Sequence, residues 1–379
     1  MKRELGGRRL RVDIRPSPGY EDTTETSIQI VTSKQKKVTV NGDITAYGNL
    51  YVADSKSGDS QNSDVVYFKG TVAADGYRLA YPCDNRVRWQ GPVVAREFYV
   101  RSGYPGMGTH YLYSSSNRFE AITCLYNNIS AVGTNVMGGA AWTFPSGSGR
   151  ENVRGALCPA GRDQTLASLN GIPSDGGFSI DYANDTASVL TLTGGVASAT
   201  VRAALGVPGN KKYGGVSLVV DAGNDDFTQI FTNSVGTTRG TVTVRNGTLR
   251  FAGASSLTNV PSFAVTGGRL ELESTKADAF VNVTNVTVGA NATLKVGAAA
   301  VTPFADGGRV VLTLDKDAVL DLPAGAELVV QRAYRNGSPV MKGDYSGVAD
   351  EGVTARDWIV GAGRLRILAG GTGMLLYVQ

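Results

Sequence analysis

The amino-acid sequence predicts an all-β protein built as a single-stranded right-handed parallel β-helix. Three observations favour this fold class: a strand–turn–strand unit that recurs between Gly240 and Gly371, an alternation of apolar and polar residues within each unit, and 49 glycines in 379 residues. The leucine after each turn recurs at positions 249, 270, 294 and 320, which are 21, 24 and 26 residues apart. Repeats of this length are typical of a solenoid, in which each repeat forms one coil stacked on the last.

Each repeat contains strands that have one apolar face. Leu270 and Leu272 share one face of a strand, whereas Glu271 lies on the opposite face. An alternation with a period of two indicates a half-buried strand. We therefore expect the four repeat leucines to form one stacked apolar column inside the solenoid, and we expect Glu271 to face solvent.

Turn residues separate these strands. Asn246-Gly247 and Gly267-Gly268 interrupt two of the repeats, and both residue types tolerate the left-handed backbone that tight corners need. An Asn-Gly pair also closes antiparallel hairpins, so a sandwich or propeller built from hairpins is the alternative fold. Helix-forming windows are short and confined to residues 162–169 and 200–205.

The chain before residue 187 has a different composition. It holds 12 of the 16 tyrosines and two of the three tryptophans, yet strand-like runs such as Arg96–Val100 and Phe119–Leu125 continue through it. We expect irregular, loop-rich coils here, and a separate β domain is the alternative. The predicted division is a flexible basic N-terminal arm over 1–22, aromatic-rich coils or a separate β domain over 23–186, regular repeats over 187–371, and a C-terminal strand or tail over 372–379.

The net charge of +4 is concentrated at the N-terminus. The segment from Lys2 to Arg15 carries six basic and two acidic side chains, so it holds the whole surplus. A basic arm can contact nucleic acid, but no nucleic-acid-binding motif accompanies this one, so we expect a frayed terminus and no nucleic-acid partner. No apolar run of signal-peptide length follows Met1, and no stretch of about 20 apolar residues predicts a transmembrane segment.

The repeats from about residue 187 to 371 resemble the autotransporter-associated β-strand repeat proteins, which are secreted or surface-displayed parallel β-helices of bacteria. The resemblance rests on six segments: Ser188–Gly195, Asn246–Phe251 and Gly267–Leu272, and a closing block of Val329–Gly337, Gly343–Gly347 and Trp358–Ile367. It implies an extracellular or cell-surface scaffold with a structural, adhesive or glycan-contacting role. The partners that it implies are surface glycans or a host extracellular matrix, and the chain is expected to be a monomer or part of a longer chain. Because no secretory signal is visible, export implies a fragment or a mis-set start.

Aromatic residues of the first half form the candidate carbohydrate-binding set. Exposed aromatic rings can stack on sugar rings, and tyrosine and tryptophan also carry polar groups suited to interfaces. Packing in the core, as ladders between coils, is the alternative role for these side chains. The set consists of Tyr99, Tyr104, Tyr111, Tyr113 and Trp142.

The alternative function is a carbohydrate-active enzyme of the β-helix type, either a polysaccharide lyase or a glycoside hydrolase. Such enzymes need clustered carboxylates, sometimes with calcium. The candidate metal ligands are Asp221, Asn224 and Asp226, and a second acidic cluster spans 315–321. Aspartate is also favoured in turns, so we expect no cofactor, and we assign no catalytic residue.

The remaining reactive side chains are few. His110 is the only histidine, which excludes a zinc site built on a histidine pair, and we expect it to be a surface or packing residue. The three cysteines, Cys83, Cys124 and Cys158, are too few and too far apart for a dense disulfide framework. We expect a buried thiol at Cys124, and one disulfide stays open as an alternative for an exported protein.

Overall fold

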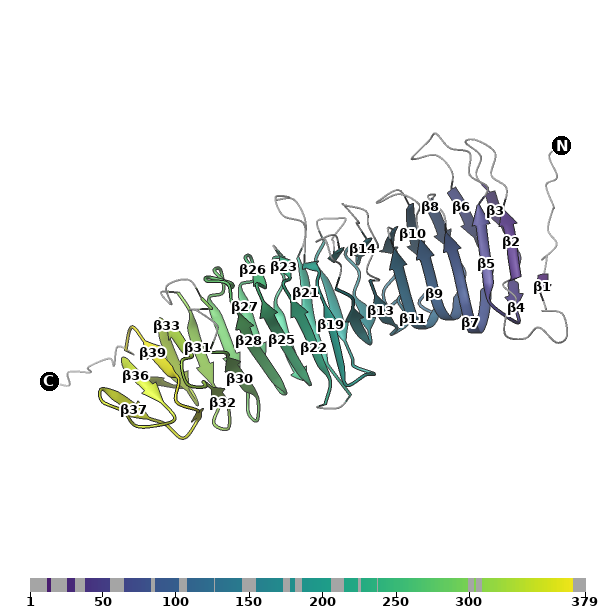
Figure 1. Ribbon diagram of the computed structural model, residues 1–379. Helices are drawn as coiled ribbons and strands as arrows, with labels where there is room; N and C mark the ends of the chain where they lie inside the picture. Colours follow the sequence, from purple (N-terminus) through teal and green to yellow (C-terminus); the bar gives the residue numbers. More distant parts are fainter. Residues whose placement is uncertain are drawn as a thin grey trace. The chain divides into compact units, whose positions relative to one another are not determined.

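The computed structural model contains strands and turns and no helix among the residues that it describes (Figure 1). These strands form a parallel β-solenoid of about 9 turns, which confirms the predicted fold class. Within the same ranges, no helix has the length and apolar character that a membrane span requires. The described residues are 12–14, 26–30, 38–54, 65–82, 86–101, 108–125, 127–144, 155–172, 178–180, 186–205, 215–223, 226–236, 238–298, 303–304 and 309–370.

The chain divides into two compact units. The first unit comprises Met1–Thr193 with Lys211–Tyr213, and the second comprises Gly194–Asn210 with Gly214–Gln379. Each unit has its own stacked strands and its own apolar core. The short windows with helical character are strands instead: residues 164–166 and 168–170 belong to the first unit, and residues 198–201 and 204–205 belong to the second.

The first unit contains two long parallel sheets and one short strand pair. One sheet contains β1 (Val12–Ile14), β4 (Ile44–Ala46), β7 (Val72–Pro82), β9 (Val93–Arg101), β11 (Arg118–Leu125), β13 (Ala141–Thr143) and β16 (Ser168–Asn170), with β2 (Thr26–Ile30) and β5 (Leu50–Asp54) joined at β7. The second contains β3 (Val38–Val40), β6 (Val65–Phe68), β8 (Arg86–Trp89), β10 (Gly108–Leu112), β12 (Asn127–Ala131), β14 (Gly155–Cys158) and β17 (Phe178–Ile180). The pair is β15 (Gln164–Leu166) and β18 (Ser188–Leu192).

The second unit contains four groups of strands. One sheet contains β21 (Val216–Asp221), β24 (Val242–Asn246), β27 (Ser262–Val265), β29 (Asn285–Val288), β31 (Val311–Leu314), β34 (Arg332–Arg335) and β35 (Ser338–Val340). A second contains β19 (Ser198–Val201), β22 (Thr228–Thr232), β25 (Thr248–Gly253), β28 (Arg269–Ser274), β30 (Thr293–Val296), β32 (Val319–Asp321) and β38 (Ile359–Val360). A third contains β20 (Ala204–Leu205), β23 (Val235–Gly236) and β26 (Ser256–Leu257). The fourth contains β33 (Glu327–Val330), β39 (Arg364–Ile367), β36 (Gly343–Ser346) and β37 (Val353–Ala355).

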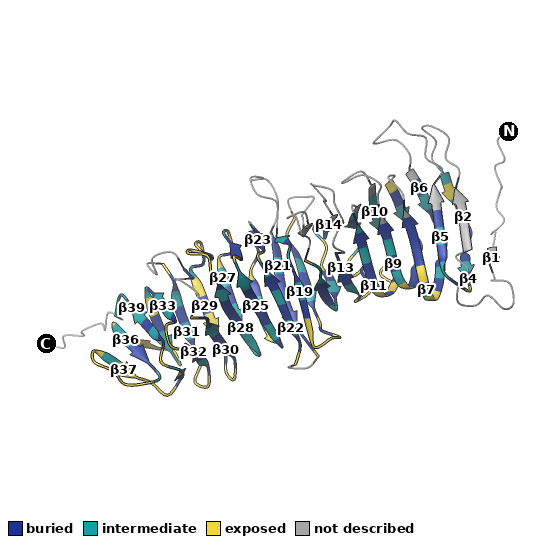
Figure 2. Ribbon diagram, in the orientation of Figure 1, coloured by how far each residue is buried: buried dark blue, intermediate teal, exposed yellow. Residues whose placement is uncertain are grey.

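The repeat leucines form the apolar column that their spacing predicts. Leu270 is the register partner of Leu249 on one side and of Leu294 on the other, and Leu294 is the partner of Leu320. All four side chains are fully buried. Buried residues, dark blue in Figure 2, continue from strand to strand through this unit. Because neighbouring strands lie about 4.8 Å apart, each leucine packs against the ones above and below.

Aromatic rings fill the core of the first unit. Phe68 on β6 and Trp89 on β8 are register partners, and their rings stack with centroids 4.4 Å apart. Tyr81 and Phe98 meet the indole of Trp89 edge-on, at 5.7 and 5.5 Å. Edge-to-face and offset-stacked pairs are the geometries that aromatic quadrupoles favour. The buried rings therefore fix how the coils of this unit stack.

Glycine is required at one corner of the second unit. Gly247 has a φ of +81°, and Gly268 on the next coil has a φ of +64°. A Cβ atom at Gly268 would collide with the carbonyl oxygen of Gly247. The predicted Asn246-Gly247 and Gly267-Gly268 turns are thus corners of a coil, and the two strands that flank the first of them, β24 and β25, lie in different sheets.

The antiparallel pairs of the second unit lie near its C-terminal end. β34 and β35 form a hairpin whose turn residues, Asn336 and Gly337, both have positive φ. A two-residue turn of this kind matches the twist of antiparallel strands. β35 is the last strand of its sheet and contains Pro339, which has no N–H to donate. Proline on an edge strand limits further strand pairing there.

Candidate functional site

Three outward side chains of the first unit form a row that crosses three coils, which we call the Tyr–Arg–Tyr row. It consists of Tyr67 on β6, Arg88 on β8 and Tyr111 on β10, which are register partners. The residues beside them on each strand are buried, so the alternation points these three outward. The guanidinium of Arg88 lies 5.6 Å from the ring centroid of Tyr67 and 5.2 Å from that of Tyr111.

Tyr113 extends the row. Arg88 Nη1 donates a hydrogen bond of 2.8 Å to its hydroxyl oxygen. Arg88 Nε is buried, and it has no hydrogen-bond partner among the residues that the structure describes. Half-buried tyrosine edges beside a guanidinium can bind a ligand that has both C–H faces and oxygen acceptors.

Tyr99 lies on the other sheet of the same unit, on β9. Its ring is 5.3 Å from the guanidinium carbon of Arg78. Arg78 Nε also pairs with Glu97 Oε2 at 2.6 Å, and Glu97 Oε1 accepts a hydrogen bond from Thr123 at 2.7 Å. Tyr99 is half-buried beside the ion pair of Arg78 and Glu97. Because β9 belongs to the other sheet, Tyr99 is separate from the Tyr–Arg–Tyr row.

Trp142, another predicted aromatic residue, does not join these tyrosines. Trp142 on β13 is fully buried, and its ring packs against Phe144 with centroids 5.6 Å apart. Its indole is thus part of the core, which was the alternative role for the set. Tyr104 lies outside the described residues.

The predicted metal ligands are not brought together where the structure describes them. Asp221 on β21 pairs with Arg245 on β24, with 3.3 Å between Nη1 and Oδ2. Asp226 is exposed at the start of the next strand, and Asn224 lies outside the described residues. Over the described ranges, no group of three or more His, Cys, Asp or Glu side chains is placed to hold a metal ion. Of the second acidic cluster, Asp321 forms an ion pair with Arg269.

A cluster of charged side chains in the second unit surrounds Glu271. Glu271 on β28 has register partners Arg250 on β25 and Lys295 on β30, so the charges alternate in sign across three coils. Arg250 Nε donates to Glu271 Oε2, and Arg269 Nε donates to Oε1 at 2.7 Å. Lys295 Nζ lies 2.6 Å from Glu273 Oε1 and 3.8 Å from Glu271 Oε1.

This cluster corrects one prediction. Glu271 points away from the core, as the alternation predicts, but it is only 4% exposed. The side chains of Arg250 and Arg269 cover it. Burial alone raises the pKa of Glu271, but hydrogen bonds from Arg250 and Arg269 outweigh burial and hold the pKa below its usual value. The carboxylate is therefore negatively charged, and the two arginines balance its charge. A general acid, by contrast, needs a raised pKa.

His110 is a packing residue in the aromatic core, which confirms one of the two roles expected for it. It is fully buried, and its Nδ1 accepts a hydrogen bond of 3.1 Å from Trp89 Nε1. The proton of the neutral ring therefore sits on Nε2, which has no partner among the described residues. Burial lowers the pKa of His110 to about 3. Cys124, which was expected to be buried, is fully buried in β11, and Cys83 lies outside the described residues.

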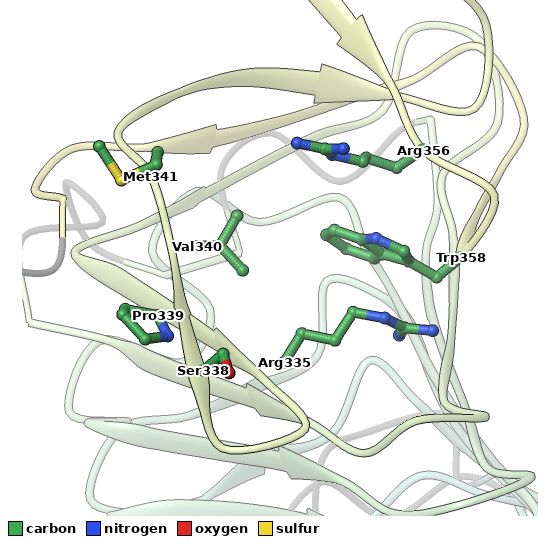
Figure 3. Close-up of a pocket in the computed structure, with 7 residues that line it drawn as sticks. All are labelled: Arg335, Ser338, Pro339, Val340, Met341, Arg356 and Trp358. Carbon is green, nitrogen blue, oxygen red and sulfur yellow. The ribbon is translucent and has the colours of Figure 1, made fainter.

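A hollow of about 290 Å³ opens near the C-terminal end of the second unit (Figure 3). One wall carries Trp358 with Arg335 and Arg356, and the facing wall carries Pro339, Val340 and Met341. The guanidinium carbon of Arg335 lies 5.2 Å from the indole of Trp358, and that of Arg356 lies 5.2 Å from the ring of Tyr345. The hollow thus combines cationic, aromatic and apolar groups.

Sequence reasoning missed Arg88, Arg78 and this hollow. Arg88 alternates with Val87 and Trp89, so an alignment of the coils would have placed it between two tyrosines. The hollow has no comparable signal, because Arg335 and Trp358 are 23 positions apart and meet through the loops between β35 and β38. No family model matches this chain, and no curated protein or solved structure gives a significant match.

Proposed function

We propose that this chain is a secreted or surface-displayed β-solenoid scaffold with an adhesive role, and that it contacts glycans through the Tyr–Arg–Tyr row. The observation that supports this proposal is the row itself, in which Arg88 lies between the rings of Tyr67 and Tyr111 on adjacent coils. Stacked coils repeat such outward positions at regular spacing, and a long glycan chain is a ligand that matches a repeating surface. We further propose that the repeats are related to autotransporter-associated β-strand repeat proteins, and this resemblance supports display outside the cell.

The chemistry of the row favours acidic glycans. Arg88 supplies a guanidinium that can bind a carboxylate or sulfate through a charge-assisted hydrogen bond. The tyrosine rings supply apolar edges for the C–H faces of the sugar and hydroxyls for its oxygens. The partners that we propose are therefore glycans of a cell surface or of a host extracellular matrix.

A scaffold role is favoured over catalysis by the state of the clustered carboxylates. Glu271 and Glu273 are both ion-paired with Arg250, and Asp321 is paired with Arg269. The pKa of Glu271 lies below its usual value, whereas the acid of a glycosidase needs a raised pKa. We expect no release of reducing or unsaturated sugars from acidic polysaccharides, with or without calcium.

A binding experiment tests the proposal. Oligogalacturonates and neutral oligosaccharides of equal length are titrated into the protein by calorimetry. We expect the acidic series to bind more tightly, and we expect Tyr111→Ala and Arg88→Gln to weaken that binding about tenfold, the loss expected for one stacking or charge-assisted contact. Tyr47→Ala is the matched control, because Tyr47 is exposed and lies outside the row. Equal binding by wild type and Tyr111→Ala, or no binding by either series, would contradict the proposal.

A further inference from the structure

The side chain of Arg335, which lines the hollow beside Trp358, is held in place by hydrogen bonds to the main chain. Arg335 Nη1 donates to the carbonyl oxygens of Asp315 and Ala318 at 3.3 and 3.4 Å. Its Nη2 donates to the carbonyl oxygen of Lys316. The guanidinium of Arg335 is therefore anchored below Trp358, where Figure 3 places it.

Hydrogen bonds also hold the main chain of Met341, on the facing wall, and that of Arg356. The hydroxyl of Tyr345 donates to the carbonyl oxygen of Met341 at 2.9 Å, and Tyr345 is only 4% exposed. The main-chain nitrogen of Arg356 donates to the carbonyl oxygen of Ser346 at 2.8 Å. In Figure 3 the side chain of Arg356 extends over the hollow toward Met341.

The charge of the hollow is not balanced within the described part of the chain. There, neither Arg335 nor Arg356 forms an ion pair with a carboxylate. Arg364 and Arg366, on the nearby strand β39, both pair with Asp344. A ligand that carries one carboxylate would balance the positive charge of Arg356.

The facing wall calls for an apolar group next to that carboxylate. Met341 is 65% exposed, the highest value for a large apolar side chain among the residues described, and Val340 and Pro339 continue the wall. Methionine is flexible and polarisable, so it adapts to apolar side chains of different shapes. Trp358 is only 6% exposed and has Arg335 over its ring, so it offers little free ring face for a sugar.

We propose that this hollow binds a free α-carboxylate with a neighbouring apolar side chain, as at the C-terminus of a partner peptide. Arg356 binds the carboxylate, and the apolar side chain lies against Val340 and Met341. The volume of about 290 Å³ suits one residue of such a peptide. This site lies in the second unit, and its ligand is not a glycan. The proposal for this site can therefore be tested independently of the proposal for the Tyr–Arg–Tyr row.

Two small molecules that differ only in charge test the proposal on the full chain. N-acetyl-phenylalanine carries the carboxylate, and N-acetyl-phenylalaninamide does not. Binding is followed by tryptophan fluorescence, because Trp89 and Trp142 are fully buried in the first unit and Trp358 borders the hollow. We expect the acid to bind with a Kd on the order of millimolar, and we expect the amide to bind at least about tenfold more weakly. Trp358→Phe should remove the signal.

Variants assign the carboxylate contact to Arg356. Arg356→Gln should weaken binding of the acid about tenfold and leave binding of the amide unchanged. Arg332→Gln is the matched control, because Arg332 is an exposed arginine of the same unit that does not line the hollow. A thermal melt checks that each variant is folded. Should Arg356→Gln fail to fold, Met341→Gln serves in its place and should weaken binding of both compounds.

Three outcomes would overturn the proposal. Equal affinity for the acid and the amide would mean an apolar hollow that does not recognise charge. Tighter binding of glucuronate than of N-acetyl-phenylalanine would mean a sugar-acid site. No saturable fluorescence change with any of these compounds would mean that the hollow is not a binding site.

Discussion

Leu270 and Glu271 are neighbours on β28 that point to opposite faces, and both are buried, at 0% and 4% exposure. Leu270 is buried by the leucines of adjacent coils, whereas Glu271 is buried by arginine side chains on the outer face. The inner face is therefore held by apolar packing, and this part of the outer face by ion pairs. The stability of the second unit depends on both.

Replacement of Leu270 by aspartate should destabilise the second unit strongly. The substitution places a carboxylate between Leu249 and Leu294, which are both fully buried. Burial of an unpaired polar group costs several kcal/mol. Leu270→Met, which nearly conserves volume, should cost less than about 1.5 kcal/mol. Urea unfolding of both variants measures the difference, and a silent Leu270→Asp would contradict the inward assignment.

Glu271→Ala should destabilise the protein by about 1–3 kcal/mol, because it leaves partly buried arginines without their acceptor. Glu351→Ala removes an exposed carboxylate of the same unit and should change stability by less than about 0.5 kcal/mol. Equal unfolding midpoints for these two variants would show that the cluster does not contribute.

The pKa of Glu271 also predicts that the stability of the protein decreases at acid pH. The pKa of Glu271 is lower in the folded protein than its usual value of 4.5. The unfolded chain therefore takes up the proton first as pH falls, so the contribution of Glu271 is fully present above pH 4.5 and is lost as pH falls through the folded pKa. Urea unfolding of the wild type and of Glu271→Gln below pH 4.5 should converge.

The buried imidazole of His110 should make the stability of the protein depend on pH in a second, higher range. Its pKa is about 3 in the folded protein, against an ordinary value of 6.5. Below pH 6.5 the unfolded chain binds a proton that the buried ring does not, so stability falls as pH decreases toward 3, by up to about 1.4 kcal/mol per pH unit. Between pH 7 and 5.5 the loss should be about 1 kcal/mol, and His110→Gln should abolish it. An unchanged wild-type stability over this range would contradict the buried neutral state.

The alternation of residue types was enough to predict the inner face. Leu249 and Leu270 follow turns at equivalent positions in successive repeats, so their stacking follows from the period of the repeat. His110 is two residues before Leu112, which places it on the inner face by the same rule. The burial of Glu271 could not be predicted from its own strand, because the side chain of Arg250 that covers it comes from another coil.

The functional surfaces were predicted less completely, for a physical reason. Tyr111 and Tyr113 were identified by residue type alone, but Arg88 becomes their partner only once β8 and β10 are in register. Trp142 shows the converse, since an aromatic side chain serves a core as well as a surface. Inward or outward direction decides between these roles, and that depends on the register of each coil.

Parallel stacking of the coils in register is the central claim, because it creates the leucine column and the Tyr–Arg–Tyr row alike. Thr287 on β29 and Thr313 on β31 are outward-facing register partners, whereas Val311 pairs with Asn285. Partners lie about 4.8 Å apart, and a two-residue offset along the strand increases this to about 8 Å, beyond the reach of a disulfide. Cysteines at 287 and 313 should therefore cross-link under mild oxidation, as identified by peptide mapping, and cysteines at 287 and 311 should not. Cross-linking of 287 to 311 in preference to 313, or of neither pair, would contradict the stacked-coil account.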